Sequence, residues 1–159
     1  ACDRGEVSFD GPHHSFDTVG FYPRPEQESG PPLWLGGSAS PTFRRAAEHG
    51  VGWTISGQSP EGISEGRDRL LHAWDDYDRS GKPAIAANVD GLVTDDPINA
   101  DEPLAGSVES VIEGVKAYRE AGATRLNLQL SSDPRGGTLN VEERIEQIER
   151  FGDEVLPEV

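Results

Sequence analysis

The sequence predicts an α/β protein in which parallel strands alternate with helices. Three observations lead to this fold class: four short apolar segments that each precede a helical segment, serine or asparagine caps where helices should begin, and glycines where several should end. The intervening helices are long enough to return the chain for parallel pairing. Four such strands form either an open sheet covered on both faces or half of an eight-stranded barrel, and the pattern alone leaves both open.

The first of these units contains a phosphate-binding type of turn. An apolar run at residues 33–35 is expected to be a strand buried on both faces, and Gly36 and Gly37 follow it. Ser40 is expected as the N-cap of the next helix. Residues 36–40, here called the diglycine corner, would direct backbone N–H groups and the positive end of a helix dipole at one place, which suits an anion. Tight turning alone is the alternative, and the pattern is neither GxGxxG nor a Walker A loop.

The remaining units repeat this strand and helix pattern. Strands are expected at residues 52–57, 84–93 and 124–130, and helices are expected to start at the caps Ser59, Ser107 and Asn140. The last helix is expected to carry Ile145, Ile148 and Val155.

The fourth strand has two different faces. Leucines alternate along it, whereas Arg125, Asn127 and Gln129 share the opposite face. In a closed barrel one face of each strand points inward, so these polar residues would line an internal site.

The N-terminal part of the chain differs from the rest. We interpret residues 1–32 as a β-hairpin and proline-rich excursion, and residues 33–159 as the repeating domain. Short strands are expected at residues 7–11 and 14–16, with a third pass at 19–22.

Composition restricts the partners. The chain has 29 acidic and 14 basic residues, with a net charge of −15, which argues against nucleic acid or an anionic membrane surface. Only Lys82 and Lys116 are lysines, and an acid-rich, lysine-poor surface suggests a halophilic source, because salt screens its self-repulsion. Cys2 is the single cysteine, so we expect neither a disulfide framework nor a cysteine metal site, and no metal site is predicted. Without a long apolar run or a signal peptide pattern, we expect a soluble cytoplasmic protein, with further sequence upstream of Ala1.

A succession of short segments carries a family resemblance. They are VSFDG at residues 7–11, PRP at 23–25, PPLWLGGS at 31–38, AAEHGVGW at 46–53, YREAGA at 118–123 and VLP at 155–157. In this order they resemble the bacterial luciferase-like oxidoreductases, which include FMN-dependent monooxygenases and coenzyme F420-dependent reductases and dehydrogenases. Family members are TIM barrels, and this chain resembles their C-terminal half only.

The resemblance has implications for fold and function. It favours the barrel, so the expected architecture is about four βα units of a TIM (β/α)8 barrel, preceded by the hairpin. It implies a flavin- or deazaflavin-dependent oxidoreductase that acts on a small-molecule substrate with FMN or F420. The cofactor phosphate, or the corresponding region of F420, would lie at the diglycine corner: Gly36, Gly37, Ser38, Ala39 and Ser40. No catalytic residue is identified.

Two further residues are candidates for the rim of the site. Trp53 lies at one end of the second strand, where the family usually has Asp-Gly-Trp, and Val51 replaces the acidic residue. We expect Trp53 in the core rather than against the cofactor, with the rim as the alternative. Arg135 lies on the loop after the last strand, where a phosphate or substrate clamp competes with an ordinary surface arginine.

The resemblance also implies what the chain lacks. The first strands of the family supply much of the pocket for the cofactor ring. We therefore expect a fragment of a longer protein, with one subunit of a split barrel or a homodimer of halves as alternatives. A non-enzymatic half-barrel that needs a partner or its missing N-terminal half is the alternative function.

Overall fold

The computed structural model describes residues 5–20, 22–28, 30–96, 98, 104–131, 133 and 136–159. The chain divides into two compact units, Ala1–Leu33 and Trp34–Val159. Within the described residues, no helix has the length and apolar character needed to cross a membrane.

The first unit is an antiparallel hairpin of two strands. Val7 pairs with Val19, and Phe9 pairs with Phe16 with their rings stacked at 6.0 Å between centroids. Val19 therefore continues the second strand, and the expected separate pass at 19–22 is wrong. Phe21, within that segment, lies outside the described residues. The strands are β1 (Glu6–Asp10) and β2 (Ser15–Gly20).

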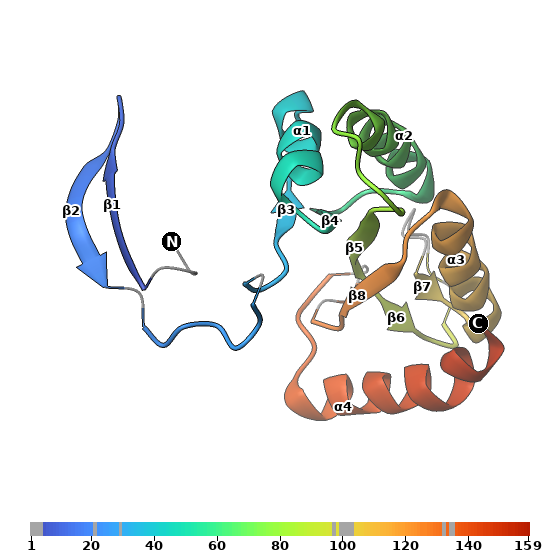
Figure 1. The fold of residues 1–159 in the computed structure, drawn as a ribbon. Coiled ribbons are helices and arrows are strands. Elements are labelled where there is room, and N and C mark those ends of the chain that lie inside the picture. The colour runs from blue at the N-terminus through green and yellow to red at the C-terminus, as the bar shows by residue number, and fades with distance from the viewer. Residues whose placement is uncertain are drawn as a thin grey trace. The chain divides into compact units, whose positions relative to one another are not determined.

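The second unit is built on a parallel sheet of four strands in the order β3-β4-β5-β8 (Figure 1). This confirms the predicted α/β class with parallel strands. The strands are β3 (Trp34–Gly36), β4 (Gly52–Ser56), β5 (Ala84–Asp90) and β8 (Arg125–Gln129). The helices are α1 (Ser40–His49), α2 (Pro60–Asp76), α3 (Val108–Ala121) and α4 (Val141–Arg150), followed by a π-helical turn η1 (Phe151–Val155) and a 3-10 turn η2 (Leu156–Glu158).

The strand expected at residues 84–93 is interrupted. β5 ends at Asp90, and the next residues form β6 (Leu92–Val93), which pairs in parallel with β7 (Ala105–Gly106). The change of partner occurs at Gly91, whose amide still donates to Gln129 beside β5, whereas the Leu92 amide donates to the Leu104 carbonyl. The segment between β6 and α3 therefore contains a short strand.

Most helix ends follow the sequence signals. Ser59 and Ser107 cap α2 and α3, and Gly122 ends α3 with φ of +106°. At the start of α4, the Asn140 amide donates to Glu143 Oε2 at 2.7 Å, and the Glu143 amide donates to Asn140 Oδ1 at 3.0 Å. The predicted capping box is thus confirmed.

The core lies between one face of the sheet and helices α1, α2 and α3. Alternate strand residues, such as Trp53 and Ile85, meet buried helix residues such as Leu70 and Tyr118. Leu33 precedes β3 and is 53% exposed, while Trp34 and Leu35 are only half-buried. The expectation of a strand buried on both faces is therefore wrong, because β3 is an edge strand that packs on helices with one face only.

The last helix carries its apolar residues in different environments. Val155 is fully buried, but Ile145 and Ile148 are 51% and 60% exposed, so they are not the buried face of α4. α4 packs on β6 through Gln147 instead, whose side-chain amide accepts from the Val93 amide and donates to the Val93 carbonyl. A polar contact with a strand edge thus joins α4 to β6.

Candidate functional site

The diglycine corner joins β3 to α1. Gly37 has φ of +118°, a conformation that favours glycine, and a Cβ there would lie 3.1 Å from Thr42 Oγ1. A Cβ at Gly36 would meet its nearest atom, the Thr54 carbonyl oxygen, at an ordinary 3.7 Å. The second glycine is therefore the one that this turn requires.

The helix that follows the corner begins without a side-chain cap. The N-cap is Ala39 rather than the expected Ser40, and among the described residues no side chain caps this end of α1. Pro41 occupies one of the first two positions, where a missing N–H costs nothing. The Thr42 amide donates to the Ala39 carbonyl at 2.9 Å. The backbone N–H groups of residues 38–40 are therefore the ones that can meet an acceptor, such as a phosphate oxygen, at the positive end of the helix dipole.

Arg69 of α2 adds a positive charge to this corner. Its guanidinium donates to the Ser38 carbonyl at 3.0 Å and to Ser40 Oγ at 3.1 Å, and it lies 4.4 Å from the centroid of the Phe43 ring. Sequence reasoning missed Arg69, because it lies 29 residues from Ser40 and no local motif links the two. The corner thus combines a helix N-terminus with a fixed cation.

Trp53 supports the corner from the core. Its side chain is 1% exposed, and its Nε1 donates to the Gly37 carbonyl at 2.7 Å. Its ring packs against Phe43 with 5.3 Å between centroids. The structure therefore places Trp53 behind the diglycine corner and among the helices.

A row of polar side chains crosses the sheet face opposite the helices. Asn127 of β8 donates to Asn88 of β5 at 2.8 Å, and Asn88 donates to Thr54 and Ser56 of β4, each at 3.2 Å. The sequence predicted the polar face of β8, and the alternating burial of that strand confirms it. Asn88, Thr54 and Ser56 were missed, because their strands are too short or too apolar to show a clear alternation.

The same face carries an aromatic and cationic pair at the start of the strands. Arg125 of β8 lies 5.3 Å from the ring centroid of Trp34 of β3. Trp34 is in register with Gly52 and Gly52 with Ala84, and Arg125 is in register with Ala86 two positions further along β5, so all four strands contribute residues to this face. The face therefore offers amides, hydroxyls and a flat aromatic surface to a polar ligand.

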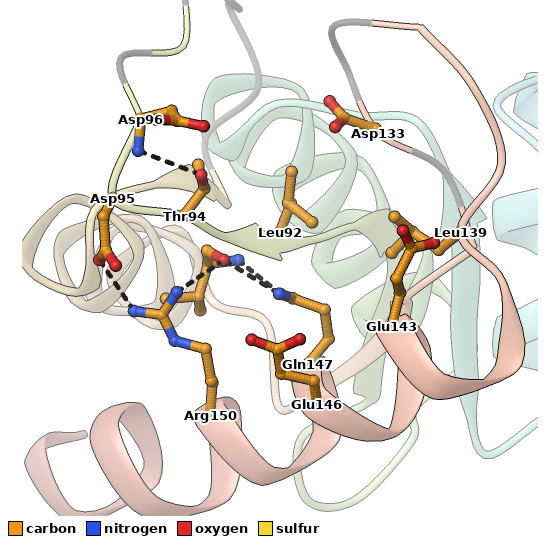
Figure 2. A pocket seen from close by; sticks show the side chains of 11 residues that line it. Leu92, Thr94, Asp95, Asp96, Asp133, Leu139, Glu143, Glu146, Gln147 and Arg150 are labelled. Atoms are coloured by element: carbon orange, nitrogen blue, oxygen red, sulfur yellow. Dashed lines mark hydrogen bonds and ion pairs between the residues drawn. The ribbon is translucent and has the colours of Figure 1, made fainter.

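A separate cavity of about 320 Å³ lies beside α4, between the segments that follow β6 and β8. Figure 2 shows carboxylates around it and the Arg150 side chain, which extends from α4 toward Asp95. The lining is Leu92, Val93, Thr94, Asp95, Asp96, Asp133, Leu139, Glu143, Glu146, Gln147 and Arg150. Arg135 lies outside the described residues, so its prediction has no structural counterpart.

Arg150 of this cavity is already bonded to carboxylates of the chain. It donates to Glu154 at 2.9 Å and to Asp95 at 3.0 Å, and these hydrogen bonds, that to Glu154 foremost, raise the pKa of its guanidinium above the ordinary value. Within the described parts of the chain, no three His, Cys, Asp or Glu residues are placed to hold a metal ion. The acidic cavity is therefore less suited to an anionic cofactor than the diglycine corner.

Comparison of sequences places the chain in a family. Residues 1–105, more than half of the chain, match the sequence profile of the luciferase-like monooxygenases. The chain belongs to the luciferase-like monooxygenase family. The predicted resemblance is thus confirmed, and no curated protein matches the sequence of this luciferase-like chain.

Solved structures share its fold at low identity. The monooxygenase RslO1 from Streptomyces bottropensis is 17% identical with a TM-score of 0.78, over 98% of this chain and 56% of that one. An F420-dependent secondary alcohol dehydrogenase, solved with an F420-acetone adduct, is 16% identical with a TM-score of 0.72. The match covers 98% of this chain and 56% of the dehydrogenase. A third structure is the oxygenating constituent of 3,6-diketocamphane monooxygenase from the CAM plasmid of Pseudomonas putida, in complex with FMN. It is 14% identical with a TM-score of 0.68, and the match covers 99% of this chain and 59% of that one. The luciferase-like chain therefore spans little more than half the length of these structures.

Proposed function

We propose that the luciferase-like chain is the C-terminal half of a TIM-barrel oxidoreductase that uses FMN or coenzyme F420. Its four parallel strands would form half of the barrel, and the polar face of the sheet would point into the barrel. Family membership supports an oxidoreductase, and the similar structures with FMN or F420 support these two cofactors. The substrate is proposed to be a small molecule, with its identity and the choice between oxygenation and hydride transfer left to experiment.

The diglycine corner is the observation that carries this proposal. It combines an uncapped helix N-terminus, a glycine whose missing Cβ allows close approach, and the positive charge of Arg69. These features fit the terminal phosphate of FMN or the corresponding region of F420. Ser38, Ala39 and Ser40 would hold the phosphate through their backbone N–H groups, and Trp53 would fix the turn by its bond to the Gly37 carbonyl.

The cofactor would supply the redox chemistry, and the chain would bind and orient it. The row formed by Asn127, Asn88 and Ser56 lies on the sheet face that would point into the barrel. Their amide and hydroxyl groups would bind polar atoms of the cofactor or the substrate there. The helices behind the sheet would exclude water from one side of the site.

The experiment is a titration of FMN and F420 into the complete protein, extended upstream of Ala1, with the cofactor fluorescence as readout. The Ser38→Asp variant should bind at least about tenfold more weakly, because a carboxylate there would repel the phosphate and pair with Arg69. Ser59→Asp is the matched control, since aspartate is an equally good N-cap at α2. Unchanged affinity of Ser38→Asp would remove the corner from the site, and a complete protein that binds neither cofactor would contradict the enzyme proposal.

A half-barrel that needs a partner is the second candidate. The edge strands β3 and β8 have no further strand beside them in the described sheet, which leaves backbone groups to pair with another chain or segment. Light scattering on the chain as printed separates the cases: a stable monomer at high concentration contradicts a homodimer of halves. The halophilic source and the cytoplasmic location remain predictions.

A further inference from the structure

A second cavity lies at the opposite end of the sheet from the diglycine corner. It has a volume of about 440 Å³ and is lined by Arg67, Leu71, Lys82, Pro83, Ile85, Arg119, Gly122, Ala123 and Thr124. Lys82 and Pro83 directly precede β5, and Thr124 directly precedes β8, so the cavity lies at the amino ends of these strands. The diglycine corner follows the carboxyl end of β3, so the two places are separate.

The charge of this cavity is unusual for the chain. Three of the 14 basic residues line it, in a protein with 29 acidic residues, and no described residue of the lining is acidic. Arg67 is held in place, because it donates to the Ala121 carbonyl at 3.0 Å and pairs with Asp68 at 2.9 Å. Among the described residues no carboxylate pairs with Lys82 or Arg119, so their charges are available to a ligand.

The rest of the lining is apolar. Ile85 is 2% exposed, Pro83 is buried, and Leu71 and Ala123 complete a hydrocarbon surface. Thr124 contributes no free hydroxyl, because its Oγ1 accepts from the Ile85 amide at 2.9 Å and donates to the Ile85 carbonyl at 3.1 Å. The volume lies within the range of about 300–1,000 Å³ typical of small-molecule sites.

We propose that this cavity binds a small organic anion with a carboxylate or phosphate head and an apolar body. The head lies between Lys82 and Arg119, and the body covers Leu71 and Ile85. The net charge of −15 does not prevent this, because carboxylates beyond about 8 Å are largely screened at physiological ionic strength. This site is independent of the proposed cofactor site, and its ligand is recognised by charge and apolar area together.

A purely structural role makes a different prediction. Arg119 lies in the last turn of α3, where a cation favours the helix dipole, so it stabilises that helix even without a ligand. In that case its replacement lowers stability and leaves ligand affinity unchanged. Measurement of both quantities on the same variants separates the two roles.

The experiment is calorimetric titration of the chain with octanoate and octyl phosphate, and with 1-octanol and inorganic phosphate. We expect one octanoate or octyl phosphate per chain, bound at least tenfold more tightly than 1-octanol or inorganic phosphate. The double variant Lys82→Gln, Arg119→Gln should lose at least tenfold in affinity. The double variant Lys116→Gln, Arg44→Gln removes the same two charges from exposed positions outside the cavity and should bind like the wild type.

Nuclear magnetic resonance of the wild-type chain gives a readout that does not depend on how the variants fold. Octanoate should shift the backbone amide signals of Ile85, Gly122 and Ala123, and leave those of Gly37 and Ser38 unchanged. Equal binding of 1-octanol, equal affinity of the two double variants, or shifts confined to other parts of the chain would each overturn the proposal. Absence of binding by both organic anions would do the same, without bearing on the cofactor site.

Discussion

Replacement of Gly66 by alanine tests the packing that supports the diglycine corner. Gly66 lies on the buried side of α2, against the ring of Trp53. An added Cβ would lie 2.2 Å from Trp53 Cη2 and 2.5 Å from Cζ3, where ordinary contacts are 3.4–4 Å. The ring would have to retreat by more than an ångström, but it is 1% exposed and its Nε1 is bonded to the Gly37 carbonyl at 2.7 Å.

The expected effect is a net loss of stability. Overpacking of a buried site costs about 1–3 kcal/mol, and loss of the bond from Trp53 to Gly37 adds about 0.5–1.5 kcal/mol. Alanine in place of glycine within a helix stabilises the folded chain by about 1 kcal/mol through its higher helix propensity. The two costs together exceed the gain in helix propensity, so Gly66→Ala should lower the free energy of unfolding by about 0.5–3.5 kcal/mol.

Urea unfolding at 25 °C, followed by far-ultraviolet circular dichroism at fixed salt, measures this change. Gly152→Ala is the matched control, because no atom lies within 4 Å of its added Cβ and the residue is in a helical turn. We expect it to stabilise the chain by about 0.4–1 kcal/mol. A Gly66→Ala variant as stable as the wild type, with an unchanged denaturant slope, would refute the packing argument.

Three further predictions concern the surface. Asn140→Ala should cost about 1 kcal/mol in urea unfolding, because it removes the cap of α4, while Asn140→Asp should keep it; equal losses would show that the cap contributes nothing. The Glu61 pKa lies below its ordinary value of 4.5, because its own backbone amide and the Ser59 side chain donate hydrogen bonds to the carboxylate. These bonds stabilise the folded chain while Glu61 is ionised, so Glu61→Gln should be less stable than the wild type above pH 4.5. That difference should vanish as the pH falls through the lowered pKa, and a difference that is independent of pH would contradict the assignment. The melting temperature should rise from low to molar KCl, because salt screens repulsion among 29 acidic residues, and a fall would rule out the halophilic prediction.

Local signals predicted much of the fold. The caps Ser59, Ser107 and Asn140 each bond to a residue three positions further along the chain, and the structure confirms each of them. The cap predicted at Ser40 is wrong, because Arg69 from another helix donates a hydrogen bond to the Ser40 hydroxyl and the N-cap is one residue earlier, at Ala39. A cap predicted from sequence is thus reliable only where no distant side chain competes for it.

The candidate site was only partly predictable. The glycines and serines of the diglycine corner were visible in the sequence, as was the polar face of β8 around Asn127. The partners Arg69 and Asn88 were not, because 29 and 39 residues separate them from the groups that they contact. The exposure of Ile145 was not predictable either, because the periodicity of a helix does not say which neighbour covers each face.

The sequence by itself determined the α/β class, the alternation of strands and helices, most helix ends and the family. These features depend on periodicity, capping and glycine conformation, which act over a few residues along the chain. Only the tertiary structure decided that Trp53 holds Gly37, that amides and hydroxyls from three strands form one row, and that Lys82 and Arg119 line one cavity. Those contacts join residues from 16 to 39 positions apart in the sequence. They form because parallel pairing places strands side by side that are separated along the chain by a helix.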